Sequence, residues 1–157
     1  MSTTGLDVFD ITFQKTHVWL NDIMSELACE GDRKAAYVAL RSVLHALRDH
    51  LTIEEATDLG AQLPLLIRGI YYEGWTLSGK PVKERNKEAF LVHIRHAFTD
   101  NETINVENIA RAVFRVLTTH IDTGEIAHVK RLLPAALRSL WPDIPQQSQP
   151  SSEMVSK

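Results

Sequence analysis

The sequence predicts an all-α fold, a helical bundle of about eight helices built from two pseudo-symmetric four-helix repeats. Apolar residues recur with a period close to 3.6 along nearly all of the 157 residues. Positions 39–71 match positions 109–141 without a gap, as expected when one helical unit is written twice. Signals for the start of a helix also stand at the same place in each copy.

The repeat aligns each position with the one 70 residues later. Eight of the 33 aligned positions are identical, and 12 of the other 25 exchange one apolar residue for another. The polar identities are the informative ones, because matched apolar residues are what two equivalent cores require. The identical pairs are Arg41/Arg111, Val43/Val113, Leu47/Leu117, His50/His120, Glu55/Glu125, Leu63/Leu133, Pro64/Pro134 and Arg68/Arg138.

The first unit spans residues 6–75 and opens with two long helices. Asp32 is placed to cap the second of them, which runs to about His50 with one apolar face. The first helix is expected to stop near Gly31. It is marked by Phe9, Phe13, Leu20, Met24 and Leu27.

Two shorter helices complete this unit. Thr52 and Glu55 read as a capping box, in which a hydroxyl and a carboxylate bond the free N–H groups at a helix start. That third helix runs to about Ala61. The dipeptide Leu63-Pro64 then begins a fourth helix, because proline is tolerated in the first turn, where no N–H donor is needed.

The second unit spans residues 82–141 and follows a turn at 76–81 that contains Ser, Gly and Pro. Asn105 is placed to cap one of its helices. Asp122 and Glu125 are expected to restart a helix with the hydrogen-bond pattern of the first unit's capping box. The two units should share one globular domain.

The composition excludes several classes of protein. The net charge of −3, from 17 basic and 20 acidic residues, lacks the basic excess of a general nucleic-acid binder. A single cysteine, Cys29, allows no intramolecular disulfide. No signal peptide opens the chain, and no run approaches the ~18 apolar residues of a membrane span. We therefore expect a cytoplasmic protein outside the membrane, with a disordered tail at 142–157 that is rich in Pro, Ser and Gln.

Motifs for chemistry are missing or broken. Residues 74–80 have the glycine and lysine spacing of a phosphate-binding loop, but Pro81 stands where a Ser or Thr must bind Mg²⁺. His93 and His96 share one side of a helix without the further ligands that zinc needs. No nucleophile elbow or spaced carboxylate pair is present. The sequence thus predicts no catalytic residue, no metal site and no cofactor.

The repeat-matched polar residues are the first candidates for a binding site. Arg41, Arg111, Arg68 and Arg138 could form internal ion pairs, with Glu55 and Glu125 at hand, or could bind an anion or an acidic partner. The sequence leaves both interpretations open.

Two further groups of residues are candidates. His50 and His120 stand near the end of a helix in each unit, where an imidazole can bond the last carbonyls or form part of a paired pocket. Tyr72 and Trp75 belong to an aromatic cluster that either packs between helices or anchors a protein interface.

Several segments resemble the prokaryotic domain-of-unknown-function family numbered 2267. The segments are ALRSVLHALRDHL (39–51), GAQLP (60–64), YYEGW (71–75), AVFRVL (112–117) and LPAALRSLW (133–141). The similarity covers roughly residues 6–142. It implies a small all-helical cytosolic protein of bacteria or archaea, and it brings no established activity, cofactor or catalytic residue.

The leading hypothesis for function is a non-catalytic protein-interaction or adaptor module with an unknown protein partner. It follows from a chain that offers helical surface, paired sites and aromatics, but no set of acid, base, nucleophile or metal ligands. A small-ligand or anion sensor using the matched Arg and His residues is the alternative. A DNA-associated regulator using residues 53–72 comes third, and an enzyme is least favoured. Formation of a homo-oligomer is compatible with the sequence.

Overall fold

The structure is a computed structural model that describes residues 3–83, 86–99 and 103–143. Every regular element in these residues is helical, which confirms the predicted all-α fold of eight α-helices, with one added 3₁₀ turn. The helices are α1 (Asp7–Leu27), α2 (Arg33–Asp49), α3 (Ile53–Ala61), α4 (Leu65–Tyr72), α5 (Lys87–Arg95), η1 (His96–Phe98), α6 (Val106–His120), α7 (Thr123–Leu132) and α8 (Ala135–Arg138).

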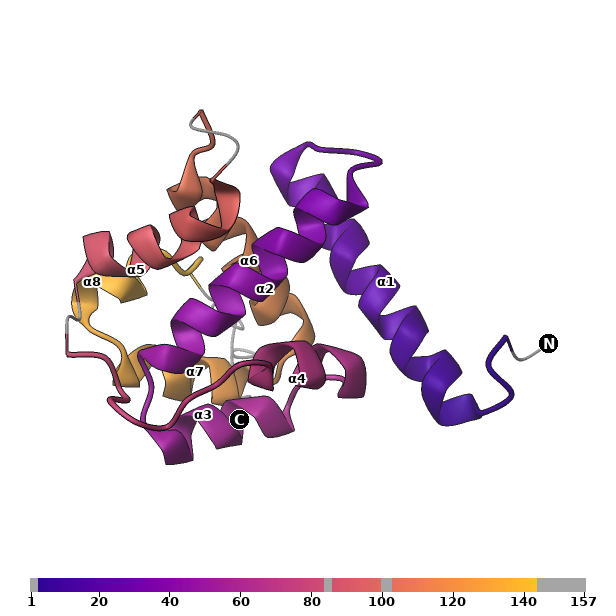
Figure 1. Ribbon diagram of the computed structural model, residues 1–157, viewed down its shortest axis with the longest axis horizontal. Coiled ribbons are helices and arrows are strands. Elements are labelled where there is room, and N and C mark those ends of the chain that lie inside the picture. Colours follow the sequence, from indigo (N-terminus) through magenta and orange to yellow (C-terminus); the bar gives the residue numbers. More distant parts are fainter. Residues whose placement is uncertain (1–2, 84–85, 100–102, 144–157) are drawn as a thin grey trace, which may run out of the picture.

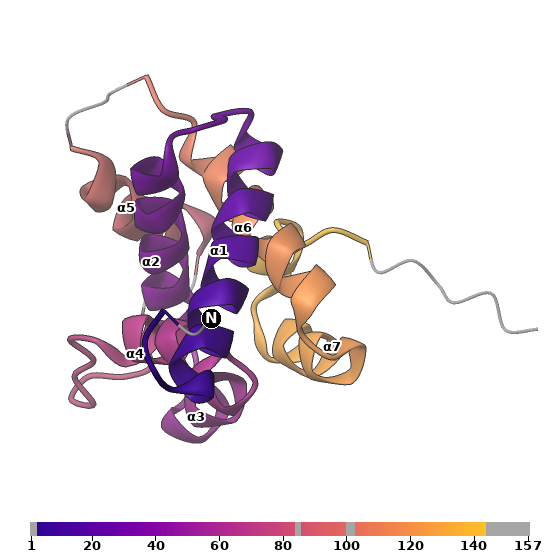
Figure 2. The ribbon, with the colours of Figure 1, turned by 90° about the vertical axis from the view of Figure 1, so that its right-hand side faces the viewer.

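Helices α2 and α6 form the centre of the bundle. Helix α2 contacts α1, α4, α5 and α6, while α6 also contacts α1, α5 and α7. Figures 1 and 2 show the shorter helices arranged around this pair. The C-terminal half of α1 joins the bundle, whereas its N-terminal half projects from the body toward the N-terminus (Figure 1).

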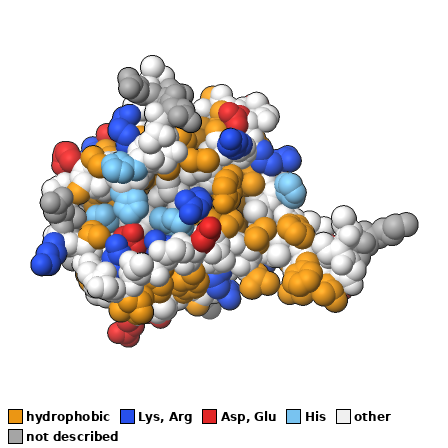
Figure 3. Space-filling model, in the orientation of Figure 1, with side chains coloured by type: hydrophobic (Ala, Val, Ile, Leu, Met, Phe, Trp, Pro, Cys, Tyr) orange, Lys and Arg blue, Asp and Glu red, His pale blue; other side chains and the backbone are white. Residues whose placement is uncertain are grey.

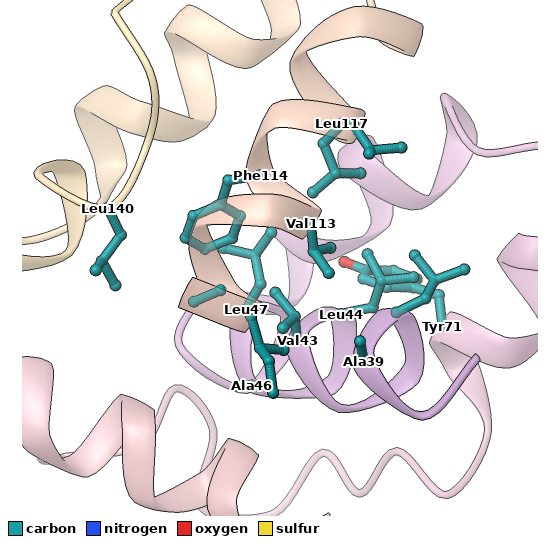
Figure 4. Close-up of a cluster of buried hydrophobic side chains, with 14 of the residues drawn as sticks. Ala39, Val43, Leu44, Ala46, Leu47, Tyr71, Val113, Phe114, Leu117 and Leu140 are labelled. Carbon is teal, nitrogen blue, oxygen red and sulfur yellow. The ribbon is translucent and has the colours of Figure 1, made fainter. Parts of the chain in front are cut away.

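The core brings the repeat-matched apolar residues of the two units together. Val43, Leu44 and Leu47 of α2 are fully buried. Figure 4 shows them beside Val113, Phe114 and Leu117 of α6, which occupy the matching positions. Burial of a large apolar side chain stabilises a fold by about 1.5–3 kcal/mol, so this contact between the units accounts for much of the cohesion of the bundle.

The helix starts follow the capping signals in the sequence. The carboxylate of Asp32 accepts from the backbone N–H of Ala35 at 3.0 Å, and Asn105 caps α6 in the same way. Thr52 and Glu55 make both bonds of the predicted capping box. These three predictions are confirmed.

The matching start in the second unit is simpler than expected. The carboxylate of Asp122 accepts from the N–H groups of Gly124 and Glu125, at 3.0 and 3.3 Å. Among the described residues, only the first unit carries the reciprocal bond, in which the backbone N–H of the capping residue donates to the Glu carboxylate. One aspartate oxygen takes both N–H groups here, so the expectation of identical hydrogen bonding was wrong.

The end of the first helix also differs from the prediction. Helix α1 ends at Leu27 because Ala28 adopts a left-handed conformation, with φ of 52°, and its N–H turns back to the carbonyls of the last turn. Helices α3 and α7 start 70 residues apart, as do α4 and α8. A two-fold relation between the units stays a prediction. The predicted disordered tail lies outside the described residues after Asp143.

Candidate functional site

Two threonines in the N-terminal half of α1 face inward. Thr12 and Thr16 face the body with 7% and 9% of their surface exposed. The hydroxyl of Thr16 donates to the carbonyl of Thr12 at 2.7 Å. The hydroxyl of Thr12 accepts from the backbone N–H of Leu66 at 2.8 Å. Because Pro64 cannot cap α4 with a side chain, Thr12 satisfies one of the free N–H groups at the start of α4.

Several large apolar side chains of the same segment are exposed, among polar ones. Phe9 and Phe13 keep 44% and 47% of their surface exposed, and Val8, Ile11 and Val18 are also exposed. A surface helix normally buries its apolar stripe and leaves polar side chains in water. Figure 3 shows hydrophobic side chains on the surface where α1 projects from the body. Large apolar side chains gathered on the surface in this way are typical of a surface that another protein covers.

One groove, which we name the α1–α4 groove, lies between α1 and α4. Its volume is about 400 Å³. Gly69 opens the α4 wall, where an added Cβ would meet no atom within 4 Å. Glu73 is the only charged residue among the described lining residues. The lining consists of Phe9, Thr12, Phe13, Leu65, Leu66, Gly69, Ile70 and Glu73.

A second groove, the α1–α3 groove, lies on another side of α1 and is larger, at about 840 Å³. Helix α1 supplies Val8, Ile11, Lys15 and Val18, while the end of α3 and the start of α4 form the opposite wall. Arg68 and His120 lie at its edge. The described lining residues include cationic side chains but no carboxylate, which favours an occupant that carries acidic groups.

A buried ion pair ties the end of α2 to the segment between the units. Arg48 Nε donates to Asp49 Oδ1 at 3.0 Å, and both side chains are almost fully buried. The other Asp49 oxygen lies 3.5 Å from Lys80 Nζ and 3.8 Å from His93 Nε2. Arg48 also donates to two backbone carbonyls at the end of α4, those of Tyr71 (2.8 Å) and Glu73 (3.0 Å).

This cluster uses residues that the sequence had set aside. Lys80, the lysine of the phosphate-loop-like spacing, points at Asp49. His93 is half-buried, and burial lowers its pKa more than the Asp49 carboxylate raises it. Within the described residues, no three His, Cys, Asp or Glu side chains are placed to hold a metal ion.

Arg41 and Arg111 each face a carboxylate. Arg41 Nε lies 3.5 Å from Glu73 Oε2, and Arg111 Nη2 donates to Glu107 Oε1 at 2.8 Å. Hydrogen bonds from Lys87 and Arg111 hold the pKa of Glu107 below its usual value. The partners therefore differ from those that the sequence offered, Glu55 and Glu125.

Arg68 and Arg138 have different surroundings although they match in the repeat. Arg68 donates from Nε to the carbonyl of Gly60 and from Nη2 to that of Leu63, both at 2.9 Å. It thereby caps the C-terminus of α3, where carbonyls lack helical partners. Arg138 is exposed, and among the described residues its side chain makes no hydrogen bond or ion pair.

The two matched histidines also lie among different neighbours. His50 is buried, donates from Nδ1 to the carbonyl of Ala46 at 2.7 Å, and meets the ring of Phe90 edge-on. His120 Nε2 lies 2.6 Å from the carboxylate of Asp22, and its ring stacks on Trp19 at 5.0 Å. They contact different helices and do not form one pocket.

Tyr72 and Trp75 stack on each other with ring centroids 5.6 Å apart. Both are partly buried against the core. The Tyr72 hydroxyl lies over Gly60, where an added Cβ would overlap it. The Tyr72 ring thus covers the end of α3. Whether Tyr72 and Trp75 also anchor a partner stays a prediction.

Sequence reasoning missed the outward side of α1 and the Arg48–Asp49 pair. The pair has no counterpart in the second unit, where Thr118 and Thr119 occupy the matching positions. A comparison of matched residues therefore does not identify it. A signal for the α1 surface was present. Thr12 and Thr16 stand one turn apart, so they share one face of the helix and place a small polar contact there.

Residues 16–140 match the model of a family described as an uncharacterized conserved protein, DUF2267. The chain belongs to this family, which confirms the resemblance seen in the sequence. A comparison with curated proteins found no match. The family match begins at residue 16, so Phe9 and Phe13 precede it. Among the described residues, no helix is long and apolar enough to cross a membrane.

Proposed function

We propose that the protein is a non-catalytic protein-interaction module that binds an apolar helical segment of a partner protein in the α1–α4 groove. The observation that carries this proposal is the exposure of Phe9 and Phe13 on α1, beside the buried Thr12 and Thr16. Water-exposed aromatic side chains along a groove are typical of helix-in-groove recognition.

The shape and chemistry of the groove support a helical partner. Phe9 and Phe13 stand one helical turn apart on α1, and Leu66 and Ile70 stand one turn apart on α4. Two parallel rows of apolar side chains fit the apolar stripe of an amphipathic helix, whose side chains recur every three to four residues. Aromatic side chains, phenylalanine among them, are enriched at the buried centre of protein interfaces.

Charge favours a protein over a lipid surface. Helices that lie on membranes carry Lys and Arg beside their apolar face, because biological membranes are anionic. The segment here carries Asp7 and Asp10 in its first turn, and Glu73 stands at the groove. These carboxylates would repel an anionic membrane.

The other two hypotheses draw less support from the geometry. The guanidinium of Arg68 is directed at carbonyls of its own chain, which supports a packing role over an anion sensor. The DNA hypothesis relies on residues 53–72, where the exposed side chains of α4 include Leu65 and Leu66. Apolar side chains offer no contact to phosphates.

Photo-crosslinking in the cells that make the protein tests the proposal. A benzoylphenylalanine in place of Phe13 should form an adduct with a partner protein. The same probe in place of Leu77, an exposed apolar residue outside the groove, should not. In a Gly69→Leu chain the adduct from position 13 should disappear, because the new side chain starts in open space at the groove wall and occupies the groove.

Three outcomes would contradict the proposal. They are the absence of an adduct at position 13, equal adducts from positions 13 and 77, and an adduct that Gly69→Leu leaves unchanged. The melting temperature of Gly69→Leu should equal or exceed that of the unmodified chain, so loss of the adduct cannot be ascribed to unfolding.

A further inference from the structure

We infer that the α1–α3 groove holds helix α1 of a second copy of this chain, packed antiparallel to the first α1 in a two-fold symmetric dimer. This inference concerns a different groove from the one in the proposed function, and each can fail without the other. It rests on the spacing of one helical face and on its charges.

The face of α1 that lines this groove has the spacing of a helix–helix seam. Val8, Ile11, Lys15 and Val18 are separated by three, four and three residues, and all four line the groove. This is the a/d pattern through which two helices pack side by side. All four residues are exposed in the single chain, so nothing within the described fold covers the seam.

The charges on this face attract each other across the dimer only when the two α1 helices are antiparallel. In an antiparallel pair, Val8 can lie opposite Val18 of the second copy and Ile11 opposite Lys15. The lysine stem then covers the isoleucine, and its ammonium reaches Asp7 about one turn, ~5.4 Å, further along. A parallel pair would instead place Lys15 against Lys15 and Asp7 against Asp7.

Both charged groups are available for this contact. Asp7 and Lys15 are exposed, and neither takes part in an ion pair among the described residues. The described lining of the groove contains Lys15 and Arg68 and no carboxylate, while the first turn of α1 brings Asp7 and Asp10. A two-fold interface uses the same surface of both copies. Each copy therefore supplies both the acidic first turn of α1 and the basic groove that receives it.

Charge reversal and mixing test this dimer. Sedimentation velocity of the unmodified chain should show a species of twice 17.7 kDa that dissociates on dilution over roughly 1–300 µM. The single variants Asp7→Lys and Lys15→Glu should each dissociate at least about tenfold more easily, because both ion pairs become repulsive. An equimolar mixture of the two variants should associate again, because each pair then joins opposite charges.

Matched controls separate this contact from general effects. Lys34→Glu changes the net charge as Lys15→Glu does, at an exposed position on α2, and should leave the dimer unchanged. Ile11→Asp should abolish the dimer, whereas Val92→Asp should not, although each side chain is 51% exposed in the single chain.

Four results would overturn the inference. A monomer at every concentration of the unmodified chain would do so, as would a dimer that the single charge reversals leave intact. Failure of the mixed variants to associate would rule out the antiparallel pairing of Asp7 with Lys15. Loss of the dimer in Gly69→Leu would move the contact to the α1–α4 groove and leave the α1–α3 groove without its proposed occupant.

Discussion

Tyr71 shows how a polar atom is accommodated inside this core. Its ring is fully buried, and its hydroxyl donates to the carbonyl of Ala56 at 2.7 Å. Burial raises the pKa of the Tyr71 hydroxyl, which therefore remains a protonated donor at any ordinary pH. The bond joins the end of α4 to α3.

Removal of this hydroxyl should be measurable as a loss of stability. Tyr71→Phe should lower the free energy of unfolding by on the order of 1 kcal/mol, because it deletes a buried hydrogen bond without a change in packing. Urea denaturation followed by circular dichroism measures the difference. The same substitution at the exposed Tyr37 should change stability little, and equal losses at both positions would contradict the role given to the Tyr71 bond.

His45 makes the stability depend on pH. Its Nε2–H donates to the carbonyl of Ile70 at 2.7 Å in a buried setting. Burial lowers the pKa of His45, and the Ile70 carbonyl opposes this effect. Among the charged neighbours, Arg48 and Arg41 lower the pKa further, while Asp49 raises it.

The sign of the pH effect follows from this lowered pKa. Below the ordinary histidine value of 6.5 the unfolded chain takes up a proton that the folded chain resists. The free energy of unfolding should therefore fall as the pH drops through 6.5, until the folded-state pKa is reached. Urea midpoints between pH 5 and pH 8 should show this slope, and His45→Gln should reduce it. An equal reduction by His96→Gln, at an exposed position, would contradict the assignment to His45.

At the scale of elements, α3 and α4 each contain one glycine, and the two glycines have opposite surroundings. A Cβ at Gly69 of α4 would meet no atom within 4 Å, whereas a Cβ at Gly60 of α3 would overlap the hydroxyl of Tyr72 and come within 3.1 Å of the Tyr71 ring. A glycine inside a helix costs roughly 0.5–1 kcal/mol relative to alanine. The space around each glycine therefore decides whether a change to alanine raises or lowers the free energy of unfolding.

The same change at these two positions should have opposite effects. Gly69→Ala should raise the free energy of unfolding by about 0.5–1 kcal/mol, and Gly60→Ala should lower it by about 1–3 kcal/mol, because the new methyl forces the tyrosines to shift. Thermal melts compare the two variants. If Gly60→Ala were as stable as Gly69→Ala, the close packing of Tyr72 on α3 would be disproved.

Helix boundaries were largely predictable because they depend on local chemistry. Thr52 and Glu55 can satisfy only N–H groups a few residues away, so their hydrogen bonds can be read directly from the sequence. The early end of α1 was harder to predict from the sequence, because alanine does not favour the left-handed conformation that Ala28 adopts. The sequence thus predicted the number and order of the helices better than the point at which the first one ends.

At the scale of the whole molecule, the repeat predicted the core but not the candidate site. Matched apolar residues such as Val43 and Val113 serve the same purpose in both units, whereas His50 and His120 do not, because His50 meets Phe90 of α5 and His120 stacks on Trp19 of α1. Periodicity identified Phe9 and Phe13 as apolar but could not tell whether anything covers them. Only the packing of α1 on α4 shows that the threonines face inward.

The bond between Thr12 and the N–H of Leu66 bears on how the α1–α4 groove can respond to a ligand. Its two walls share this hydrogen bond, so widening the groove would leave a donor of α4 without its partner. The groove should therefore behave as a fixed slot. A docking helix would find the slot already formed, and most of the conformational entropy lost on binding would belong to the partner.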